Sequence, residues 1–473
     1  MDANLYINGE WVPTEKRITV ENPATLEAVG SAPYAGKEEA LLAVAAAEAA
    51  LPAWRSKTAN ERAALILKWH QLIIENKETI ARIMTLEQGK PLQEALGEVM
   101  YAASFLTWYA EEAKRVYGQT VPASAPNKRI LVLKQPVGVV AAITPWNFPA
   151  AMITRKVGPA IAAGCTVVIK PSEYTPLTAY KLAELAHEAG IPAGVLNVVT
   201  GNEKEIGETW MADERVRKVS FTGSTRVGKL LMRQAADTVK NISLELGGHA
   251  PYIITKSANL DLAVKEFIAP KFRNAGQTCI CPNRVYVHES IRDRFVQQLT
   301  DEVRKLKVGN GLEEGVNIGP LINKAAVEKV QNHLQDALDK GAKLATPYEP
   351  ISAKGYFVPP VVLTDVSDDM LCMREETFGP VVPVVTYRTT EEVIERANKT
   401  RYGLAAYVFS QDIQEAFVIS EGLEYGIVGL NDGLPATAQA PFGGMKESGI
   451  GREGGHWGIE EFLEVKYISL NLG

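Results

Sequence analysis

The sequence is poor in cysteine and has no apolar run of membrane-spanning length. Its four cysteines, Cys165, Cys279, Cys281 and Cys372, are too few and too scattered for a disulfide framework, and no C-x-x-C pair indicates structural zinc. The six histidines are also dispersed, so the sequence gives no support for metal chemistry. The most apolar stretches, such as residues 137–143, end well before the length that a membrane span needs.

Positive charge is also in short supply. The formal net charge is −6, which argues against a general electrostatic attraction to nucleic acid or to an anionic membrane. The first residues, MDANLYINGEW, lack a basic segment followed by an apolar one, so secretion is not indicated and we expect a cytoplasmic protein.

The length exceeds what one hydrophobic core usually supports. For 473 residues, two or three domains are expected. With 46% hydrophobic and 22% charged residues, the composition is that of an ordinary globular protein with a sizeable core.

Strand and helix patterns alternate along most of the chain. A hairpin with an Asn8–Gly9 turn is followed by helical spacing and then by two α/β series. This alternation predicts doubly wound α/β domains with ligand crevices at the carboxyl ends of the strands. The predicted strands are 5–12 (the hairpin), 129–134, 138–143, 164–169, 196–199, 218–221, 243–245, 251–253, 285–287, 381–387, 405–408 and 464–470, and the predicted helices are 37–54, 60–75, 77–88, 92–117, 176–189, 204–211, 226–238, 260–274, 290–306, 324–340 and 390–398.

Cys279 is a candidate nucleophile. It lies in a polar segment that contains glycine, after the apolar residues 267–269, so its side chain is not expected to be sealed in a core. A thiol attacks a carbonyl carbon as the thiolate, and Arg273 with local backbone N–H groups would supply the field that favours this form. The alternative from this segment alone is a cysteine that packs as a small hydrophobe.

Four further segments come directly after predicted strands, where the crevice is expected. Asn147 offers an amide N–H to a developing oxyanion, and Lys170 with Glu173 places a cation and a carboxylate that suits a ribose diol. Residues 221–228, FTGSTRVG, suit a pyrophosphate at a helix N-terminus, although the usual G-x-G-x-x-G spacing is absent. Glu245, before two glycines, is a candidate general base. Each segment alone is also compatible with an ordinary polar turn.

Taken together and in order, these motifs resemble the NAD(P)-dependent aldehyde dehydrogenase superfamily over essentially the whole chain. One departure is His249, where the family commonly has Lys or Asn after ELGG. The matching motifs are TPWNFP (144–149), KPSE (170–173), FTGSTRVG (221–228), ELGG (245–248), GQTC (276–279), EETFGPV (375–381) and PFGGMKESGIGRE (441–453).

The resemblance implies a role for each matching residue. Cys279 looks like the nucleophile, Asn147 with the Cys279 backbone N–H like the oxyanion hole, and Glu245 like the base that activates water to release a carboxylic acid from a thioester. Lys156 and Glu453 fall where the family has a supporting lysine and a second glutamate. The implied cofactor contacts are Thr144, Trp146, Lys170, Glu173, Gly223, Ser224, Gly228, Glu376 and Phe378.

The resemblance also implies a fold of two doubly wound α/β domains with a small β flap that mediates oligomerisation. The NAD-binding domain is expected at residues 1–117 and 136–247, with residues 447–460 returning to its side. The catalytic domain is expected at residues 248–446, and the flap at 118–135 and 461–473. In the family this flap pairs with a neighbouring subunit, so we expect a homodimer or a homotetramer.

Within the superfamily, the sequence is most similar to succinate-semialdehyde dehydrogenase. Segments MITRKVG (152–158) and KFRN (271–274) resemble that subfamily, in which Arg155 and Arg273 would hold a substrate carboxylate; the alternative is two surface arginines on helices. Where that subfamily often has a serine, the aligned residue is Ala436, followed by Thr437. A different semialdehyde or a less polar aldehyde therefore stays an alternative substrate.

Three further expectations concern the cofactor, redox behaviour and competing functions. Glu173 predicts NAD in preference to NADP, with dual use possible. Cys281, two residues from Cys279, suggests a strained and reversible disulfide, with a buried neighbouring thiol as the alternative. A catalytically silent binding member, and a phosphorylating or CoA-acylating relative, are competing interpretations; the presence of Cys279, Glu245 and Asn147 argues against the first and Glu245 against the second.

Overall fold

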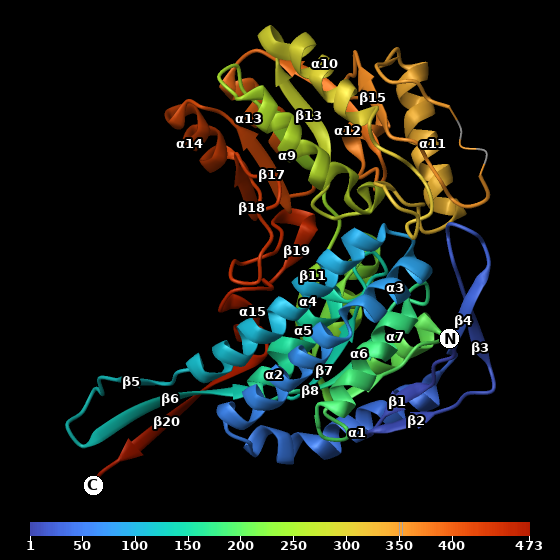
Figure 1. Ribbon diagram of the computed structural model, residues 1–473. Coiled ribbons are helices and arrows are strands. Elements are labelled where there is room, and N and C mark those ends of the chain that lie inside the picture. Colours follow the sequence, from blue (N-terminus) through green and yellow to red (C-terminus); the bar gives the residue numbers. More distant parts are fainter. Residues whose placement is uncertain (350, 352) are drawn as a thin grey trace.

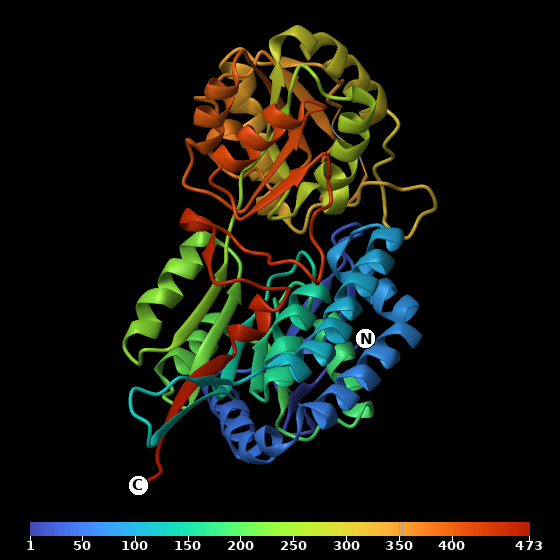
Figure 2. The ribbon, with the colours of Figure 1, turned by 90° about the vertical axis from the view of Figure 1, so that its left-hand side faces the viewer.

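Two largely parallel sheets, one in each lobe of the molecule, form its frame (Figures 1 and 2). The structure is a computed structural model and describes residues 1–349, 351 and 353–473. The parallel strands that precede residue 246 lie in the lower lobe of Figure 1, and the chain passes to the second sheet just after Glu245.

The sheet of the lower lobe has the order of a doubly wound fold. From β7 the chain moves outward through β8 and β9, and then returns to the other side of β7 to form β10 and β11, all in parallel. The order reverses between β7 and β10, which is the place where such sheets bind ligands. From edge to edge the strands are β19 (Gly449–Ile450), β11 (Asn241–Glu245), β10 (Val216–Thr222), β7 (Val139–Ile143), β8 (Thr166–Lys170), β9 (Leu196–Val198), β1 (Leu5–Ile7) and β2 (Glu10–Val12).

Helices cover both faces of this sheet. Along β7, Val139 and Ala141 belong to one hydrophobic cluster, whereas Val140 and Ala142 belong to the other, because successive side chains point to opposite faces. The first face is covered by α1 (Lys37–Ser56), α7 (Glu203–Ala212) and α8 (Thr225–Ala236), and the second by α2 (Ala59–Glu75), α3 (Lys77–Gln88), α4 (Leu92–Glu112), α5 (Ala151–Ala163) and α6 (Pro176–Glu188).

The upper lobe repeats this plan around β12, with its own hydrophobic core. All strand pairings are parallel except that of β14 with β15. The strand order is β14 (Lys343–Leu344), β15 (Val361–Thr364), β16 (Val381–Tyr387), β13 (Pro282–His288), β12 (Ala250–Ile254), β17 (Ala405–Phe409) and β18 (Ile427–Leu430), and the helices are α9 (Leu260–Phe272), α10 (Arg292–Val303), α11 (Lys324–Asp339), α12 (Leu371–Arg374), α13 (Thr390–Asn398) and α14 (Ile413–Gly422).

A three-stranded antiparallel ribbon projects from the lower lobe and carries the C-terminus (Figure 1). Its central strand pairs with the C-terminal strand from Pro136↔Leu463 to Lys128↔Asn471. The ribbon consists of β5 (Gln119–Val121), β6 (Lys128–Pro136) and β20 (Leu463–Asn471), which the short helix α15 (Trp457–Glu460) precedes, and a separate two-stranded ribbon is formed by β3 (Arg17–Glu21) and β4 (Ala28–Pro33).

The predicted doubly wound α/β class is confirmed, but some boundaries were wrong and several elements, among them β3, β4, β15, β18 and α14, were not predicted. The helix predicted over 92–117 ends at Glu112, followed by a 3-10 turn, because Lys114 and Arg115 beyond it are exposed and have no core to cover. The sequence pattern missed α5, whose thirteen residues are all buried. A helix buried all round has no polar face, and therefore lacks the periodicity by which helices are found.

None of the helices in the described part of the chain is both long enough and apolar enough to cross a membrane.

Candidate active site

Four of the predicted motifs lie at the carboxyl ends of adjacent strands in the lower sheet. Asn147 follows β7, Lys170 ends β8, Gly223 follows β10 and Glu245 ends β11. The strands that carry Asn147 and Gly223 are direct neighbours at the point where the strand order reverses. The sequence therefore places its polar residues where a doubly wound sheet forms its crevice.

A cavity of about 250 Å³ opens beside these strand ends. It brings Asn147 and the phosphate-type turn of the lower lobe together with Cys279, Glu376 and Phe378 from the upper lobe. Three polar lining residues were given no role from the sequence: Thr222 and Thr377 lie within recognised motifs but had no assigned role, and Lys329 lies outside the motifs. The lining residues are Pro145, Trp146, Asn147, Met152, Thr222, Gly223, Ser224, Gly247, Cys279, Ala326, Lys329, Glu376, Thr377 and Phe378.

The backbone before Cys279 is unusual. Asn274 and Ala275 have φ values of 53° and 55°, and Gly276 continues in the left-handed region. Such a conformation is costly for residues other than glycine and persists only where the surroundings impose it. After it, the Cys279 carbonyl approaches Gly248 so closely that a Cβ on Gly248 would lie 2.1 Å from the carbonyl oxygen. The second glycine of ELGG therefore gives the cysteine loop room to approach β11.

The Cys279 side chain is half-buried at the cavity and forms no disulfide. Burial raises the pKa of its thiol to about 12; the positive charges of Arg155 and Arg273 act against this rise, and the carboxylates of Glu376 and Glu245 add to it. In this arrangement the sulfur is a neutral thiol, so nucleophilic attack requires a base that removes its proton.

Glu245, whose charge acts on the Cys279 thiol, is a candidate for this base because of its environment. It is 4% exposed, and its Oε2 has no hydrogen-bond partner among the described residues. Burial raises the pKa of this carboxyl well above its usual range, and the negative charge of Glu453 adds to the rise, whereas Arg155 and Lys156 oppose it. A carboxylate with a raised pKa holds a proton strongly enough to act as a general base near neutral pH.

Glu453 joins both cationic residues of α5. It forms ion pairs with Lys156 and, at 2.5 Å, with Arg155 Nε. Burial alone would raise the pKa of Glu453, but the charges of Arg155 and Lys156 outweigh it and lower the pKa. The alternative of a surface arginine on a helix is wrong for Arg155, since this residue is only 2% exposed.

The second predicted arginine of the substrate pocket, Arg273, is half-buried. Its guanidinium lies 5.0 Å from the ring centroid of Phe148, and its Nε has no partner within the described chain. The Nη2 of Arg155 is likewise unpartnered there, and its guanidinium lies 4.1 Å from the ring centroid of Phe442. Both guanidinium groups therefore keep donors free for an anion, which buried donors need.

Thr437 does not supply the hydroxyl of the serine that is expected where this chain has Ala436. Ala436 packs against the upper core, and Thr437 is exposed, with its hydroxyl donating to Gln439. An oxygen donor is therefore absent at Ala436 itself.

The predicted cofactor residues surround the same strand ends. Lys170 is buried and lies 3.6 Å from Glu173, which is partly exposed. Ser224 caps α8 by accepting a hydrogen bond from the Val227 N–H, and the buried hydroxyls of Thr144 and Thr222 have no partners among the described residues. A helix N-terminus with free donors nearby fits the anionic phosphates of a dinucleotide.

Two other cofactor residues are held by contacts across the cavity. Glu376 accepts a hydrogen bond of 3.0 Å from the Gly248 N–H, and burial raises the pKa of its carboxyl to about 7. Phe378, at a φ of 57°, meets Trp146 edge to face with 5.7 Å between the ring centroids. Gly228 packs against Leu246, and a Cβ added to Gly228 would lie 2.4 Å from the Leu246 side chain. The close packing of α8 at this position therefore requires glycine.

Cys281 is buried, and its sulfur lies 3.4 Å from Lys271 Nζ. A disulfide between Cys279 and Cys281 stays a prediction, which Cys281→Ala would contradict if the variant showed the same reversible peroxide sensitivity as wild type.

Comparisons with known proteins agree with this geometry. A model described as the aldehyde dehydrogenase family matches residues 11–468. The chain is 53% identical over 469 residues to a glutarate-semialdehyde dehydrogenase of Pseudomonas putida, which covers 99% of this chain and 97% of that protein. It is 52% identical over 478 residues to the NADP(+) succinate-semialdehyde dehydrogenase of Escherichia coli, with 100% and 99% covered. The crystal structure of an E. coli NADP dependent enzyme matches with a TM-score of 0.99 and 51% identity, covering 100% of this chain and 98% of that one.

Proposed function

The chain belongs to the aldehyde dehydrogenase family and is an NAD(P)-dependent enzyme; we propose that its substrate is a short aldehyde with a carboxylate at the other end, succinic semialdehyde first. The observation that carries this choice is the pair of guanidinium groups of Arg155 and Arg273, whose charges both act on Cys279 and which keep unpartnered donors in the described structure. The relatives named for glutarate and succinate semialdehydes support the same class, and make glutarate semialdehyde the nearest alternative.

The reaction begins at Cys279. Glu245 takes the thiol proton, and the sulfur forms a bond to the aldehyde carbon, which leaves a negative charge on the carbonyl oxygen. The Asn147 amide has two N–H groups, and one of them donates to the Gln277 carbonyl at 3.0 Å. The other N–H, with the backbone N–H of Cys279, is free to stabilise the oxyanion.

NAD or NADP, when bound at the strand ends, supplies the hydride acceptor that converts the thiohemiacetal into a thioester. Lys170, Glu173, Ser224 and Glu376 are the residues that would hold it there. After Glu245 has released the thiol proton to solvent, it removes a proton from water, and the water oxygen bonds to the acyl carbon. The C–S bond breaks to release the carboxylic acid and the Cys279 thiolate, which takes up the proton held by Glu245. Since Glu245 activates water to attack the thioester, hydrolysis is favoured over transfer of the acyl group to phosphate or CoA.

Arg273→Ala is expected to lower kcat/KM for succinic semialdehyde by roughly 10- to 100-fold, because a charge-assisted hydrogen bond contributes about 1.5–3 kcal/mol. Activity on neutral aldehydes of the same length is expected to stay within about twofold of wild type, since they offer no carboxylate to Arg273. The measurement is initial NADH formation with succinic, glutaric and neutral aldehydes.

Arg304→Ala is the matched control, because Arg304 is exposed and only pairs with Asp301 on the surface. The carboxylate assignment would be wrong if wild type turned over neutral aldehydes as fast as the semialdehydes and Arg273→Ala affected both kinds of substrate equally. The assignment as an aldehyde dehydrogenase would not be affected by that result.

We also propose that NAD is preferred over NADP. Glu173 carries this preference, because a carboxylate beside a 2′-phosphate loses a hydrogen bond and adds repulsion. Glu173→Ser is expected to raise the ratio of kcat/KM for NADP over NAD by about tenfold. Glu184→Ser removes the glutamate of a similar Lys–Glu pair on α6 and is expected to leave the ratio unchanged. A wild type that already prefers NADP would contradict the proposal.

A homodimer or homotetramer is the proposed assembly. In the projecting ribbon, β20 pairs with β6 on one side only, and an open strand edge invites pairing with another chain. Light scattering should give a multiple of the 51.5 kDa chain mass at micromolar concentration, and a monomer would contradict this. Exposed apolar side chains on the ribbon support the same conclusion, namely Val121, Leu131, Leu133, Val465, Tyr467, Ile468 and Leu470.

A further inference from the structure

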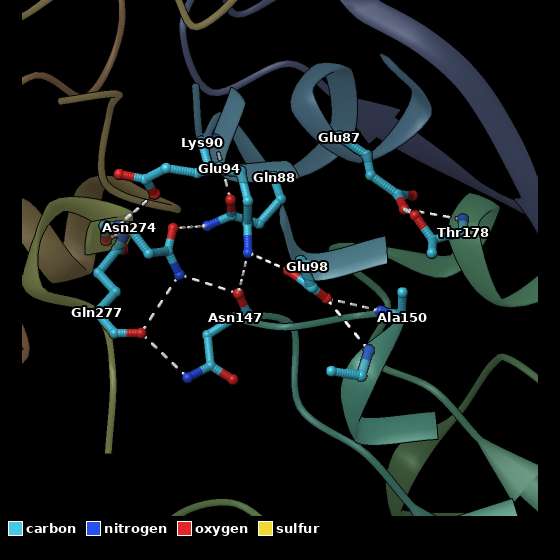
Figure 3. Close-up of polar contacts among 11 residues, drawn as sticks. Glu87, Gln88, Lys90, Glu94, Glu98, Asn147, Ala150, Thr178, Asn274 and Gln277 are labelled. Carbon is cyan, nitrogen blue, oxygen red and sulfur yellow. Dashed lines mark hydrogen bonds and ion pairs between the residues drawn. The ribbon is translucent and has the colours of Figure 1, made fainter. Parts of the chain in front are cut away.

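A buried polar network surrounds the main chain of Asn147 (Figure 3). It connects the end of α3 and the start of α4 in the lower lobe to the strained loop before Cys279 in the upper lobe. We call it the Asn147 network, and its members are Gln88, Lys90, Glu94, Glu98, Asn147, Asn274 and Gln277.

Lys90 and Glu98 hold the main chain on both sides of Asn147. Lys90 forms an ion pair with Glu98 and donates to the Asn147 carbonyl oxygen at 2.7 Å. Glu98 accepts from the Ala150 N–H at 2.9 Å and from the Ala151 N–H at 3.3 Å. Because the first residues of α5 have no side-chain cap of their own, Glu98 supplies both the acceptor and the negative charge that a helix N-terminus favours.

Asn274 ties this segment to the cysteine loop. Its side-chain N–H groups donate to the Asn147 carbonyl at 2.9 Å and to the Gln277 carbonyl at 3.3 Å, and its side-chain oxygen accepts from Gln88 at 2.6 Å. The Gln277 carbonyl also accepts from the Asn147 amide at 3.0 Å. Asn147 and the residue two positions before Cys279 are thus joined by a closed set of hydrogen bonds.

The strained turn itself depends on the same network. Asn274, at a φ of 53°, donates its backbone N–H to Glu94 at 2.7 Å. The Gln277 side chain returns to the Asn274 carbonyl at 3.0 Å. These contacts hold a backbone conformation that is unfavourable on its own.

A stabilising role alone does not account for this arrangement. Lys90 and Glu98 are each 1% exposed at the side chain. Replacing a buried ion pair by well-packed apolar residues is often neutral or stabilising, so the pair contributes little that a core of leucine and methionine would lack. What apolar residues could not supply is three directed bonds, one to the carbonyl of Asn147 and two to the N–H groups that start α5.

We propose that Lys90, Glu98 and Asn274 are positioning residues that fix the direction of the Asn147 amide toward the oxyanion and its spacing from Cys279. This inference rests on the proposed oxyanion role of Asn147. A displacement of about 1 Å in a reacting constellation can cost roughly 100-fold in rate, and removal of one oxyanion donor costs about 10²–10³-fold. Loss of the network is therefore expected to approach, and not to exceed, the effect of losing the Asn147 amide.

Two variants test the proposal without leaving a buried charge unpaired. Lys90→Met with Glu98→Gln removes both charges, and Asn274→Ala removes the tie to the cysteine loop. Each is expected to slow the first turnover of NADH formation by about 10- to 100-fold at saturating aldehyde and cofactor. Alkylation of Cys279 by iodoacetamide, which forms no oxyanion, is expected to stay within about twofold of wild type.

The control is Glu87→Gln in α3, the helix that ends at Gln88 of the Asn147 network. Glu87 is as buried as Lys90, but it accepts from the Leu177 and Thr178 N–H groups at the start of α6 and makes no bond to Asn147 (Figure 3). It is expected to lower the unfolding temperature while leaving the first-turnover rate unchanged.

Asn147→Ala separates failure of the inference from failure of the proposed function. In that background the network variants are expected to add little further loss, because they act through Asn147. Full additivity, an unchanged first turnover in the network variants, or a parallel loss of alkylation and folding would each overturn the positioning role. If Asn147→Ala itself kept the wild-type first turnover, the proposed oxyanion role would be wrong and this inference with it.

Discussion

Cys279→Ala is expected to form NADH from any aldehyde at least about 10⁴-fold more slowly than wild type. An aldehyde carbon gives up a hydride readily only once it is tetrahedral, and in the proposed mechanism the sulfur of Cys279, which lines the cavity, makes it so. The variant should still bind cofactor, which a fluorescence titration of NADH would measure. Cys165→Ala removes a buried thiol that contacts the Phe462 carbonyl, and should keep its activity. Residual turnover with an unchanged substrate deuterium isotope effect would contradict the nucleophile assignment.

The same residue predicts a pH dependence. Because burial raises the pKa of the Cys279 thiol to about 12, the thiolate fraction in the free enzyme grows with pH throughout the neutral range. The rate of alkylation by iodoacetamide should therefore rise about tenfold per pH unit from roughly pH 7 to pH 10, without a plateau. A plateau below pH 8 would show a thiolate already formed in the free enzyme, and would remove the need for Glu245 to take the thiol proton.

The fold could be predicted as far as its patterns are local. The alternation from β7 to β11 is readable because each strand is a short apolar run and the helices recognised between them, such as α8, have one polar face. α5 was missed because all of its residues are buried, and that burial follows from its place between the sheet, α4 and the C-terminal segment, which no local pattern records.

The candidate site, like the fold, could be predicted from the sequence only where its signals are local. Asn147, Lys170, Gly223 and Glu245 could be found because each directly follows a strand and lies in a recognisable motif. Their partners could not, since the bonds of Asn147 to Lys90 and Asn274 span 57 and 127 residues and that of Lys156 to Glu453 spans 297. Long-range pairs carry no periodicity, and it is these pairs that set the charge and direction of the motif residues.

The ion pair between Arg155 and Glu453 changes which arginine we expect to bind the substrate carboxylate. An arginine whose Nε is already engaged by a carboxylate offers fewer free donors than Arg273, so Arg273 becomes the stronger candidate for the substrate anion. Arg155 has a second effect, because its charge lowers the pKa of Glu453 and opposes the rise in the pKa of Glu245, which connects the substrate pocket to the proposed base.

Glu245→Gln is expected to give one burst of NADH per active site, slower than the first turnover of wild type, and then to stall, with a steady rate about 10²–10⁴-fold below wild type. The amide cannot take a proton from water, so the thioester on Cys279 forms but is not hydrolysed. Stopped-flow absorbance of NADH measures the burst amplitude and the steady rate in one experiment. Glu208→Gln, which removes an exposed carboxylate paired with Lys204, should behave as wild type.

Added hydroxylamine sharpens this prediction, because it attacks a thioester without needing a base on the enzyme. It should restore turnover of Glu245→Gln and release the acyl group as a hydroxamate. The burst rate carries separate information: a slowed burst of full amplitude would mean that Glu245 also takes the thiol proton, as the raised pKa values of Glu245 and Cys279 suggest. A variant that lacks a burst yet turns over steadily at the wild-type rate would show that another group activates the water, and would remove Glu245 from deacylation.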